Sequence, residues 1–223
     1  HVVPRLALSH LRNKVVNAVM RTVPTESNSG KEALSSDTEF TFFVNGAYIE
    51  PSLEGECMLC EGDWLTVNCW VCLNGYYSFG AHTFIVGSSQ DDEPLTSTLR
   101  DMLRQVARRA SAGHSIKEMS RTVYSLHSHD PYVLQKTFGH GVGRNRVENP
   151  ILRMNPGVND TVLLKEGMCL VIALAFKHGR SHFIKPRLMH ESTFHNPFVP
   201  FGTTVVVRPG RPEILTSFET IVK

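Results

Sequence analysis

His140 lies in a glycine-rich run, residues 139–144 (Gly-His-Gly-Val-Gly-Arg), and is the first candidate for chemistry in this sequence. A neutral imidazole can bind a divalent metal ion or act as a general base near neutral pH. A base needs a group that orients its ring, and nothing nearby in the sequence supplies one. The glycines also suggest a phosphate loop, but its lysine and its strand-to-helix setting are missing. We therefore interpret the glycines as positions of tight backbone approach.

Two cysteine pairs, Cys57-x-x-Cys60 and Cys69-x-x-Cys72, have a spacing that is typical of zinc sites. The second pair lies within residues 64–73, whose alternating pattern predicts a strand. Residues three apart on a strand point to opposite faces, so this pair does not easily share one ion. Half-buried thiols are the favoured interpretation, and zinc is the alternative. The odd total of five cysteines, without a disulfide framework, indicates a reducing compartment.

Longer motifs occur around these residues in an ordered series. They are residues 62–65 (GDWL), 73–76 (LNGY), 83–87 (TFIVG), 139–144 (GHGVGR), Glu148 with Pro150, and 164–168 (LKEGM). The series resembles the pita-bread (peptidase M24-like) family, which includes methionine aminopeptidase and aminopeptidase P. The resemblance runs from about residue 40 to residue 216. It implies an α+β fold in which helices cover a curved, mostly antiparallel sheet, here with a shortened N-terminal part.

Active members of this family hold two metal ions with five side chains, and the resemblance assigns each ligand to a position in this chain. Two aspartates, one histidine and two glutamates are expected, and the positions hold, in chain order, Asn68, Phe79, His140, Ala173 and Gly202. Two further histidines that handle the substrate correspond to Glu50 and Val147. The resemblance therefore implies a degenerate site.

The chemistry of these side chains leads to the same expectation. Two neighbouring divalent cations need several anionic oxygen ligands. An amide, a benzyl ring, a methyl group, a hydrogen atom and one imidazole supply none, and the ring of Phe79 takes up space that an ion needs. Without an ion, a bound water keeps a pKa of about 15.7 rather than about 7. We expect no metal, no cofactor and no peptidase activity; the alternative is an enzyme with one metal at His140 and Asn68.

The elements that must position these residues follow from hydrophobic spacing. Helices are expected over residues 6–23 and 98–112, and Ser115 with Glu118 forms a capping box for a third helix. Strands are expected within residues 40–86, with turns at Asn45-Gly46 and Asn74-Gly75, and around residues 134–139, 168–176 and 204–207. Residues 1–38, which end in a polar loop, are expected to belong to the same domain as the degenerate aminopeptidase-like part, residues 39–223. An unrelated mixed α/β domain is the alternative.

Length and composition fit one large domain. The chain has 223 residues, of which 41% are hydrophobic and 20% charged, as in ordinary globular proteins. No apolar run approaches the roughly 20 residues of a membrane span. The chain starts at His1 without methionine, so we expect that an upstream segment, such as a transit peptide, has been removed. The net charge of +2 does not by itself imply a nucleic-acid partner.

Basic residues cluster locally in two stretches. Within the helix expected at 98–112, one face carries Arg100, Arg104 and Arg108, with Arg109 beside them. Like charges at this spacing cost a few tenths of a kcal/mol per pair, which an anionic partner would relieve. The second stretch, residues 177–190, holds Phe183 and the cations Lys177, Arg180, Lys185 and Arg187, so it could contact phosphates and stack on a base. The alternative for both stretches is a solvated surface.

These features predict a non-catalytic binding or scaffold protein that reuses the aminopeptidase frame. Relatives that lack the ligands include a ribosome-associated proliferation protein and the large subunit of a histone chaperone, and the clustered arginines favour the RNA side. We expect docking on a ribonucleoprotein, such as an organellar ribosome or its assembly intermediate. The partners would be protein or RNA of a larger complex, with no membrane and no small-molecule substrate. The location would be intracellular: mitochondrial, cytoplasmic or nuclear. A peptide- or histone-tail-binding module is the alternative function.

Overall fold

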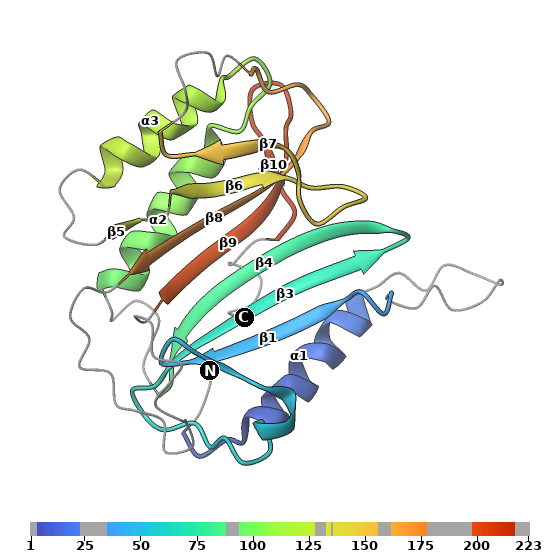
Figure 1. The fold of residues 1–223 in the computed structure, drawn as a ribbon, viewed down its shortest axis with the longest axis vertical. Helices are drawn as coiled ribbons and strands as arrows, with labels where there is room; N and C mark the ends of the chain where they lie inside the picture. Colours follow the sequence, from blue (N-terminus) through green and yellow to red (C-terminus); the bar gives the residue numbers. More distant parts are fainter. Residues whose placement is uncertain are drawn as a thin grey trace.

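The strands of the described residues join one antiparallel sheet (Figure 1). The computed structural model describes residues 4–22, 35–87, 94–127, 133–134, 136–155, 162–177 and 198–216. Its strands are β1 (Glu39–Val44), β2 (Ala47–Ile49), β3 (Trp64–Leu73), β4 (Tyr76–Ile85), β5 (Val133–Leu134), β6 (Thr137–Gly141), β7 (Glu148–Arg153), β8 (Cys169–Lys177), β9 (Phe198–Val206) and β10 (Glu213–Ile214). The strand order is β2-β1-β3-β4-β9-β8-β6-β7, with β10 beside β9 and β5 beside β8.

In the described part of the chain, three α-helices pack against this sheet: α1 (Leu8–Thr22), α2 (Pro94–Arg108) and α3 (Ile116–His127). A short 3-10 turn, η1 (Pro51–Leu53), follows β2. The α+β class and the antiparallel sheet expected from the sequence are confirmed. No helix in the described part of the chain is long and apolar enough to span a membrane.

All three α-helices cover the same face of the sheet. Helix α1 packs on one half through a core that includes Phe42 and Leu65, and α2 and α3 pack on the other half around Ile172 and Phe201. In Figure 1 α1 lies next to β1 and β3, whereas α2 and α3 lie along the β6–β9 half. Side chains alternate between the faces of a strand, so the neighbours of these core residues point to the opposite face. We call it the uncovered face, because none of the described helices lies on it.

Helix α2 and strand β9 differ in extent from the expected segments. The helix begins at Pro94 rather than Thr98, because the fixed backbone angle of proline suits the first helical turn. It ends at Arg108 rather than Ala112, where the Ala112 N–H donates to the Arg208 carbonyl instead of continuing the helix. Strand β9 begins at Phe198, well before the expected start at residue 204. The first part of this strand is not predicted from the sequence, because it contains Pro200 and Gly202 and both residue types are disfavoured inside strands.

The two halves of the sheet meet at a seam between β4 and β9. Their only registered pair in the described chain is Ala81 with Gly202. Beyond that pair, the Phe79 N–H donates to Thr204 Oγ1 at 2.7 Å, and Thr204 Oγ1 also lies 2.8 Å from the Phe79 carbonyl. Thr216 Oγ1 donates to the same carbonyl at 3.0 Å and accepts from the Thr204 N–H at 2.8 Å. Side-chain hydroxyls thus replace the missing backbone ladder.

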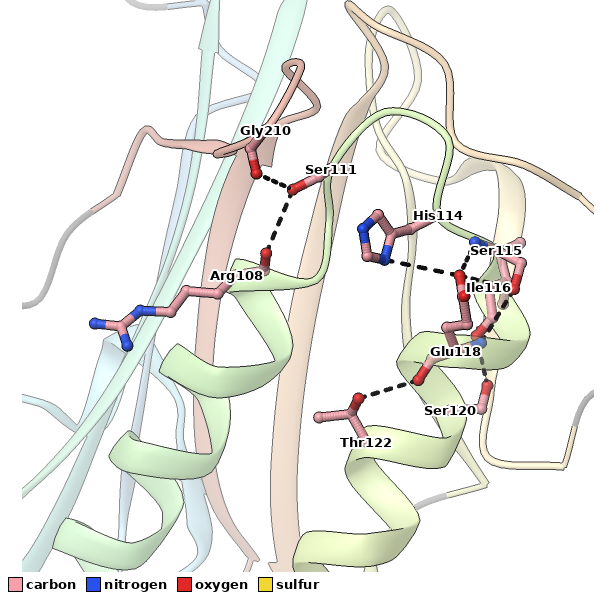
Figure 2. A network of polar contacts seen from close by, with 9 residues as sticks. All are labelled: Arg108, Ser111, His114, Ser115, Ile116, Glu118, Ser120, Thr122 and Gly210. Atoms are coloured by element: carbon pink, nitrogen blue, oxygen red, sulfur yellow. Dashed lines mark hydrogen bonds and ion pairs between the residues drawn. The ribbon is translucent and has the colours of Figure 1, made fainter.

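The connection between α2 and α3 carries the predicted capping box (Figure 2). The Glu118 N–H donates to Ser115 Oγ at 3.2 Å, and the Ser115 N–H donates to Glu118 Oε2 at 2.7 Å. This second bond lowers the pKa of the Glu118 carboxyl. The preceding Ser111 hydroxyl donates to the Gly210 carbonyl at 2.9 Å, which ties the end of α2 to the turn that follows β9.

Removing the cap should destabilise the fold measurably. We expect Ser115→Ala to lower the free energy of unfolding by about 1 kcal/mol, because an N–H at the start of α3 loses its acceptor. Urea denaturation followed by circular dichroism measures this difference. The matched control is Ser125→Ala, in the last turns of the same helix, where alanine is at least as good a helix former. Equal effects of the two substitutions would contradict a specific capping role.

Candidate functional site

Four positions form a row across the middle of the uncovered face. Asn68 of β3 lies opposite Ala81 of β4, Ala81 lies opposite Gly202 of β9, and Gly202 lies opposite Ala173 of β8. We call these four residues the central row. Three of the five positions to which the resemblance assigned metal ligands, Asn68, Ala173 and Gly202, are therefore brought together by strand register alone.

Phe79 fills the space at the centre of this row. It lies two residues before Ala81 on β4 and so points to the same face. A Cβ atom built on Gly202 would lie 2.5 Å from Phe79 Cε1 and 3.3 Å from Ala173 Cβ. Real Cβ atoms do not approach other atoms as closely as 2.5 Å, so any side chain at position 202 requires the ring to move. The ring of Phe79 therefore occupies the space that is free because residue 202 is a glycine.

His140 joins the same face from β6. It lies opposite Val171 of β8, two residues before Ala173. Its Nδ1 lies 2.8 Å from the Gly141 carbonyl. A carbonyl oxygen can only accept, so Nδ1 carries a proton and Nε2 is the nitrogen left to act as acceptor or ligand. The half-buried imidazole thus keeps one nitrogen that is suited to chemistry.

Trp70 also belongs to this site, although no sequence motif points to it. Its ring stacks on the imidazole of His140, with centroids 6.2 Å apart and planes 9° apart, and lies 4.7 Å from the ring of Phe79. The sequence does place Trp70 on the same face as Asn68, because residues two positions apart on a strand share a face. Without knowledge of the neighbouring strands, nothing marked Trp70 as different from other strand aromatics. The rings of Trp70, Phe79 and His140 thus form the base of the site, and we call them the ring cluster.

Glu50 and Val147 are not part of this ring cluster. Glu50 follows β2, is exposed and precedes the η1 turn, and β2 is separated from β3 by β1. Val147 lies between β6 and β7 with 58% of its surface exposed. Neither side chain supplies an imidazole or another group that could orient a substrate at His140.

Arg146 links the connection between β6 and β7 to residues 37–39, at the edge of the site. Its guanidinium forms an ion pair with Glu39 at 2.6 Å and donates to the Asp37 carbonyl at 2.7 Å. It also lies over the rings of Trp70 and Tyr77, 5.7 and 5.6 Å from their centroids. The bond to Glu39 raises the pKa of Arg146, so the guanidinium remains charged. The ring cluster is therefore bordered by a cation that is already neutralised by a carboxylate of the chain.

The residues present do not fit a pair of metal ions. Such a pair needs carboxylates, and the positions hold an amide, a phenyl ring, a methyl group and a hydrogen beside one imidazole. Asn68 Oδ1 is buried without a hydrogen-bond partner in the described structure, but it is a single neutral oxygen. Across the described ranges, no three His, Cys, Asp or Glu side chains come together in a way that could hold a metal. No catalytic step through a metal follows from this arrangement.

The cysteines do not form the alternative zinc site within the described residues. Burial raises the pKa of Cys69 to about 12, and burial together with Asp63 raises that of Cys57 to about 11. Zinc binds the thiolate form, which these shifts disfavour. Cys72 is buried and Cys60 is exposed, and all five cysteines of the chain are free.

The predicted basic residues lie away from the ring cluster. Arg100, Arg104 and Arg108 belong to α2, on the covered face of the sheet, with Arg109 directly after the helix. Arg104 forms an exposed ion pair with Asp101 at 3.1 Å, a contact of small energetic value. Lys177 ends β8, and Arg180, Lys185 and Arg187 fall outside the described residues.

The structure adds two arginines to the first of these groups. The Ala112 N–H donates to the Arg208 carbonyl, and the Ser111 hydroxyl donates to the Gly210 carbonyl. The turn after β9 therefore lies beside the end of α2 (Figure 2). This turn exposes Arg208 and Arg211, of which Arg208 is paired with Glu213 at 2.9 Å. We call the combined group the basic surface; its members are Arg100, Arg104, Arg108, Arg109, Arg208 and Arg211.

The close contact at the centre of the row can be tested by adding one methyl group. We expect Gly202→Ala to lower the free energy of unfolding by about 1–3 kcal/mol, because its Cβ overlaps the Phe79 ring. The double variant Gly202→Ala with Phe79→Ala should be less destabilised than the sum of the two single variants. Gly55→Ala is the control, because a Cβ there meets nothing within 4 Å. Additive effects in a denaturation cycle would contradict the contact.

Comparison with known proteins identifies the family to which this fold belongs. A family model described as metallopeptidase family M24 matches residues 9–209. Methionine aminopeptidase 1 of Bacillus subtilis is 28% identical over 135 residues, which cover 60% of this chain and 54% of that protein. The chain thus aligns with about half the length of this relative.

Solved structures show the same fold. A methionine aminopeptidase from Thermotoga maritima has a TM-score of 0.72 at 20% identity, covering 97% of this chain and 88% of the other. The N-terminal domain of the FACT complex subunit SPT16 from Cicer arietinum has a TM-score of 0.64 at 15% identity, covering 96% of this chain and 50% of the other. Because the family model matches most of the sequence, the chain belongs to metallopeptidase family M24.

Proposed function

We propose that this chain is a non-catalytic member of its family that binds a partner instead of cleaving peptides. The observation that carries the proposal is the ring of Phe79, which fills the place that a side chain at Gly202 would need. A metal site that had merely lost ligands would leave polar space behind. Here the centre of the row is closed by carbon atoms, and Ala173 adds a methyl group beside them.

The remaining polar groups do not support peptide hydrolysis without a metal. A water molecule attacks a peptide bond when a metal ion lowers its pKa or when an oriented base removes its proton. His140 is the one basic side chain among the candidate positions, and its ring stacks on Trp70. No carboxylate is bonded to its Nδ1, which instead donates to the Gly141 carbonyl. The candidate positions therefore lack the pair that metal-free hydrolysis needs, a base whose ring is oriented by an acidic side chain.

The proposed role is docking on a ribonucleoprotein through the basic surface. Exposed arginines that neutralise phosphates gain binding energy from the release of counterions. Arg108, Arg109 and Arg211 are exposed together at one end of α2, whereas Glu213 balances only Arg208. An organellar ribosome or its assembly intermediate is the specific form of this proposal, with a mitochondrial location for the protein. The protein would then act as a subunit or assembly factor of a larger complex.

RNA is favoured over basic protein tails as the partner. The N-terminal domain of the FACT complex subunit SPT16 shares the fold. Binding of peptides or histone tails is the alternative that the sequence left open. Such ligands carry positive charge and need carboxylates on the protein. The candidate metal-ligand positions hold none. Of the described carboxylates at the rim, Glu39 is already paired with Arg146, and Asp37 accepts a hydrogen bond from the Tyr77 hydroxyl at 3.0 Å. The charge of the basic surface has the opposite sign from what a histone tail requires.

Loss of metal chemistry can be measured on the purified protein. We expect calorimetric titration with manganese, cobalt or zinc to show no stoichiometric site, and a methionyl peptide to remain uncut after long incubation. The relative from Bacillus subtilis, assayed in parallel, is the positive control. Metal-dependent release of methionine that EDTA abolishes would overturn the non-catalytic proposal. A variant with Asn68→Asp, Phe79→Asp, Ala173→Glu and Gly202→Glu tests the reverse direction, and we expect it to gain metal binding if it folds.

Docking can be tested by reversing charge on the basic surface. We expect Arg108→Glu with Arg109→Glu to reduce co-sedimentation with ribonucleoprotein particles by at least about tenfold and to weaken its dependence on salt, because each lost phosphate contact lowers the slope by about 0.7–0.9. Lys14→Glu with Arg21→Glu, on exposed positions of α1, changes the net charge equally and is the matched control. Equal co-sedimentation of wild type and both double variants would contradict docking through this surface.

A further inference from the structure

A groove between α3 and β7 lies outside both the ring cluster and the basic surface. It has a volume of about 310 Å³ and is lined by Lys117, Ser120, Arg121, Tyr124, Met154 and Asn155. Figure 1 shows α3 running beside β7 at the edge of the sheet. Lys117, Arg121 and Tyr124 follow the spacing of one helix face, so the three side chains stand in line along the groove.

The groove has a fixed shape because α3 is bonded to the end of β7. Ser120 is buried, and its hydroxyl lies 2.7 Å from the Arg153 carbonyl and 2.9 Å from the Ile116 carbonyl. The Met154 N–H donates to the Lys136 carbonyl at 2.9 Å, and the Met154 side chain packs against the core beneath α2 and α3. The floor of the groove is therefore apolar and held from both sides.

Tyr124 is an exposed aromatic wall of this groove. With 63% of its surface accessible, it is the most exposed of the large hydrophobic side chains in the described structure. A ring at that exposure gains little from the protein core. An exposed ring beside an apolar floor offers a planar ligand a face on which to stack.

The charges around the ring have one sign. Lys117 and Arg121 line the groove. The exposed Arg153 precedes Met154 in the chain, and the exposed Lys136 lies beside Met154 because its carbonyl accepts the Met154 N–H. None of the described lining residues carries a carboxylate. Glu118, the nearest acid on α3, is bonded to Ser115 at the start of the helix and lies 3.7 Å from His114. Arg121 is attracted to Glu118, whose pKa it helps to lower, but no carboxylate belongs to the described lining residues. The groove therefore combines two cations with a stacking surface.

We propose that the α3–β7 groove binds single-stranded RNA, with one base stacked on Tyr124 and the flanking phosphates held by Lys117 and Arg121. This inference rests on the proposed function and names a second contact of the same partner. A volume near 310 Å³ lies at the lower end of ligand sites, which suits a single base rather than a folded segment. An acidic peptide would use the two cations but would leave the tyrosine ring unused. Base stacking and phosphate contact together account for both features.

The test is a binding titration of the full chain with a fluorescein-labelled single-stranded oligoadenylate, read by fluorescence anisotropy at several salt concentrations. We expect Tyr124→Ala to weaken binding by about tenfold and Tyr124→Phe to restore it, because stacking needs the ring and not the hydroxyl. Lys117→Gln with Arg121→Gln should lower the salt slope by about 1.4, or about 0.7 for each phosphate contact. Tyr48→Ala, an exposed tyrosine on β2, and Lys14→Gln with Arg21→Gln are the matched controls.

Each outcome bears on the groove separately from the docking proposal. Loss of binding with Tyr124→Ala and recovery with Tyr124→Phe supports the groove. Equal binding by all variants overturns it, and so does equal competition by an oligoglutamate of the same charge, since that would identify an acidic peptide site. If the wild type does not bind the oligoadenylate but still co-sediments with ribonucleoprotein particles, the groove proposal is wrong and the docking proposal stands. If it does neither, both are wrong.

Discussion

The seam between β4 and β9 is the constraint on which the rest of this structure depends. The two halves of the sheet share one registered pair, Ala81 with Gly202, and two threonine hydroxyls then carry the hydrogen bonds of Phe79. A buried backbone group without a partner costs free energy comparable to a lost hydrogen bond, so these hydroxyls keep the halves together. The same bonds fix the backbone of Phe79, and its ring is thereby placed at the centre of the uncovered face.

A ring cluster at this position changes how the face is stabilised. Carboxylates gathered in one place repel each other and need a cation to stay ionised. The ring of Trp70 instead packs against the rings of both Phe79 and His140, and these contacts require no ion. Arg146 lies over the ring of Trp70 and already has Glu39 as its counter-ion. These ring contacts therefore hold this part of the face together without any charged group of their own.

Much of the fold was predictable from local pattern. The capping box at Ser115 and the turns at Asn45 and Asn74 were expected from residue types, and the structure has the box and a positive φ at both asparagines. Strand β9 was harder, because Pro200 and Gly202 contradict strand propensity, and long-range pairing with β8 decided its length. Arg208 and Arg211 were missed for a related reason: they lie about a hundred residues from α2 in sequence and join it only through the bonds of Ser111 and Ala112.

The sequence by itself determined the family frame and the identities of the residues at the expected ligand positions, because ordered motifs along single strands are local information. Only the tertiary structure decided that Phe79 of β4 meets Gly202 of β9 and that Trp70 stacks on His140. These contacts join residues that are far apart in the chain, and strand order and register, not spacing, set their distances. A glycine and a phenylalanine are unremarkable separately; the filled centre exists because the sheet brings them face to face.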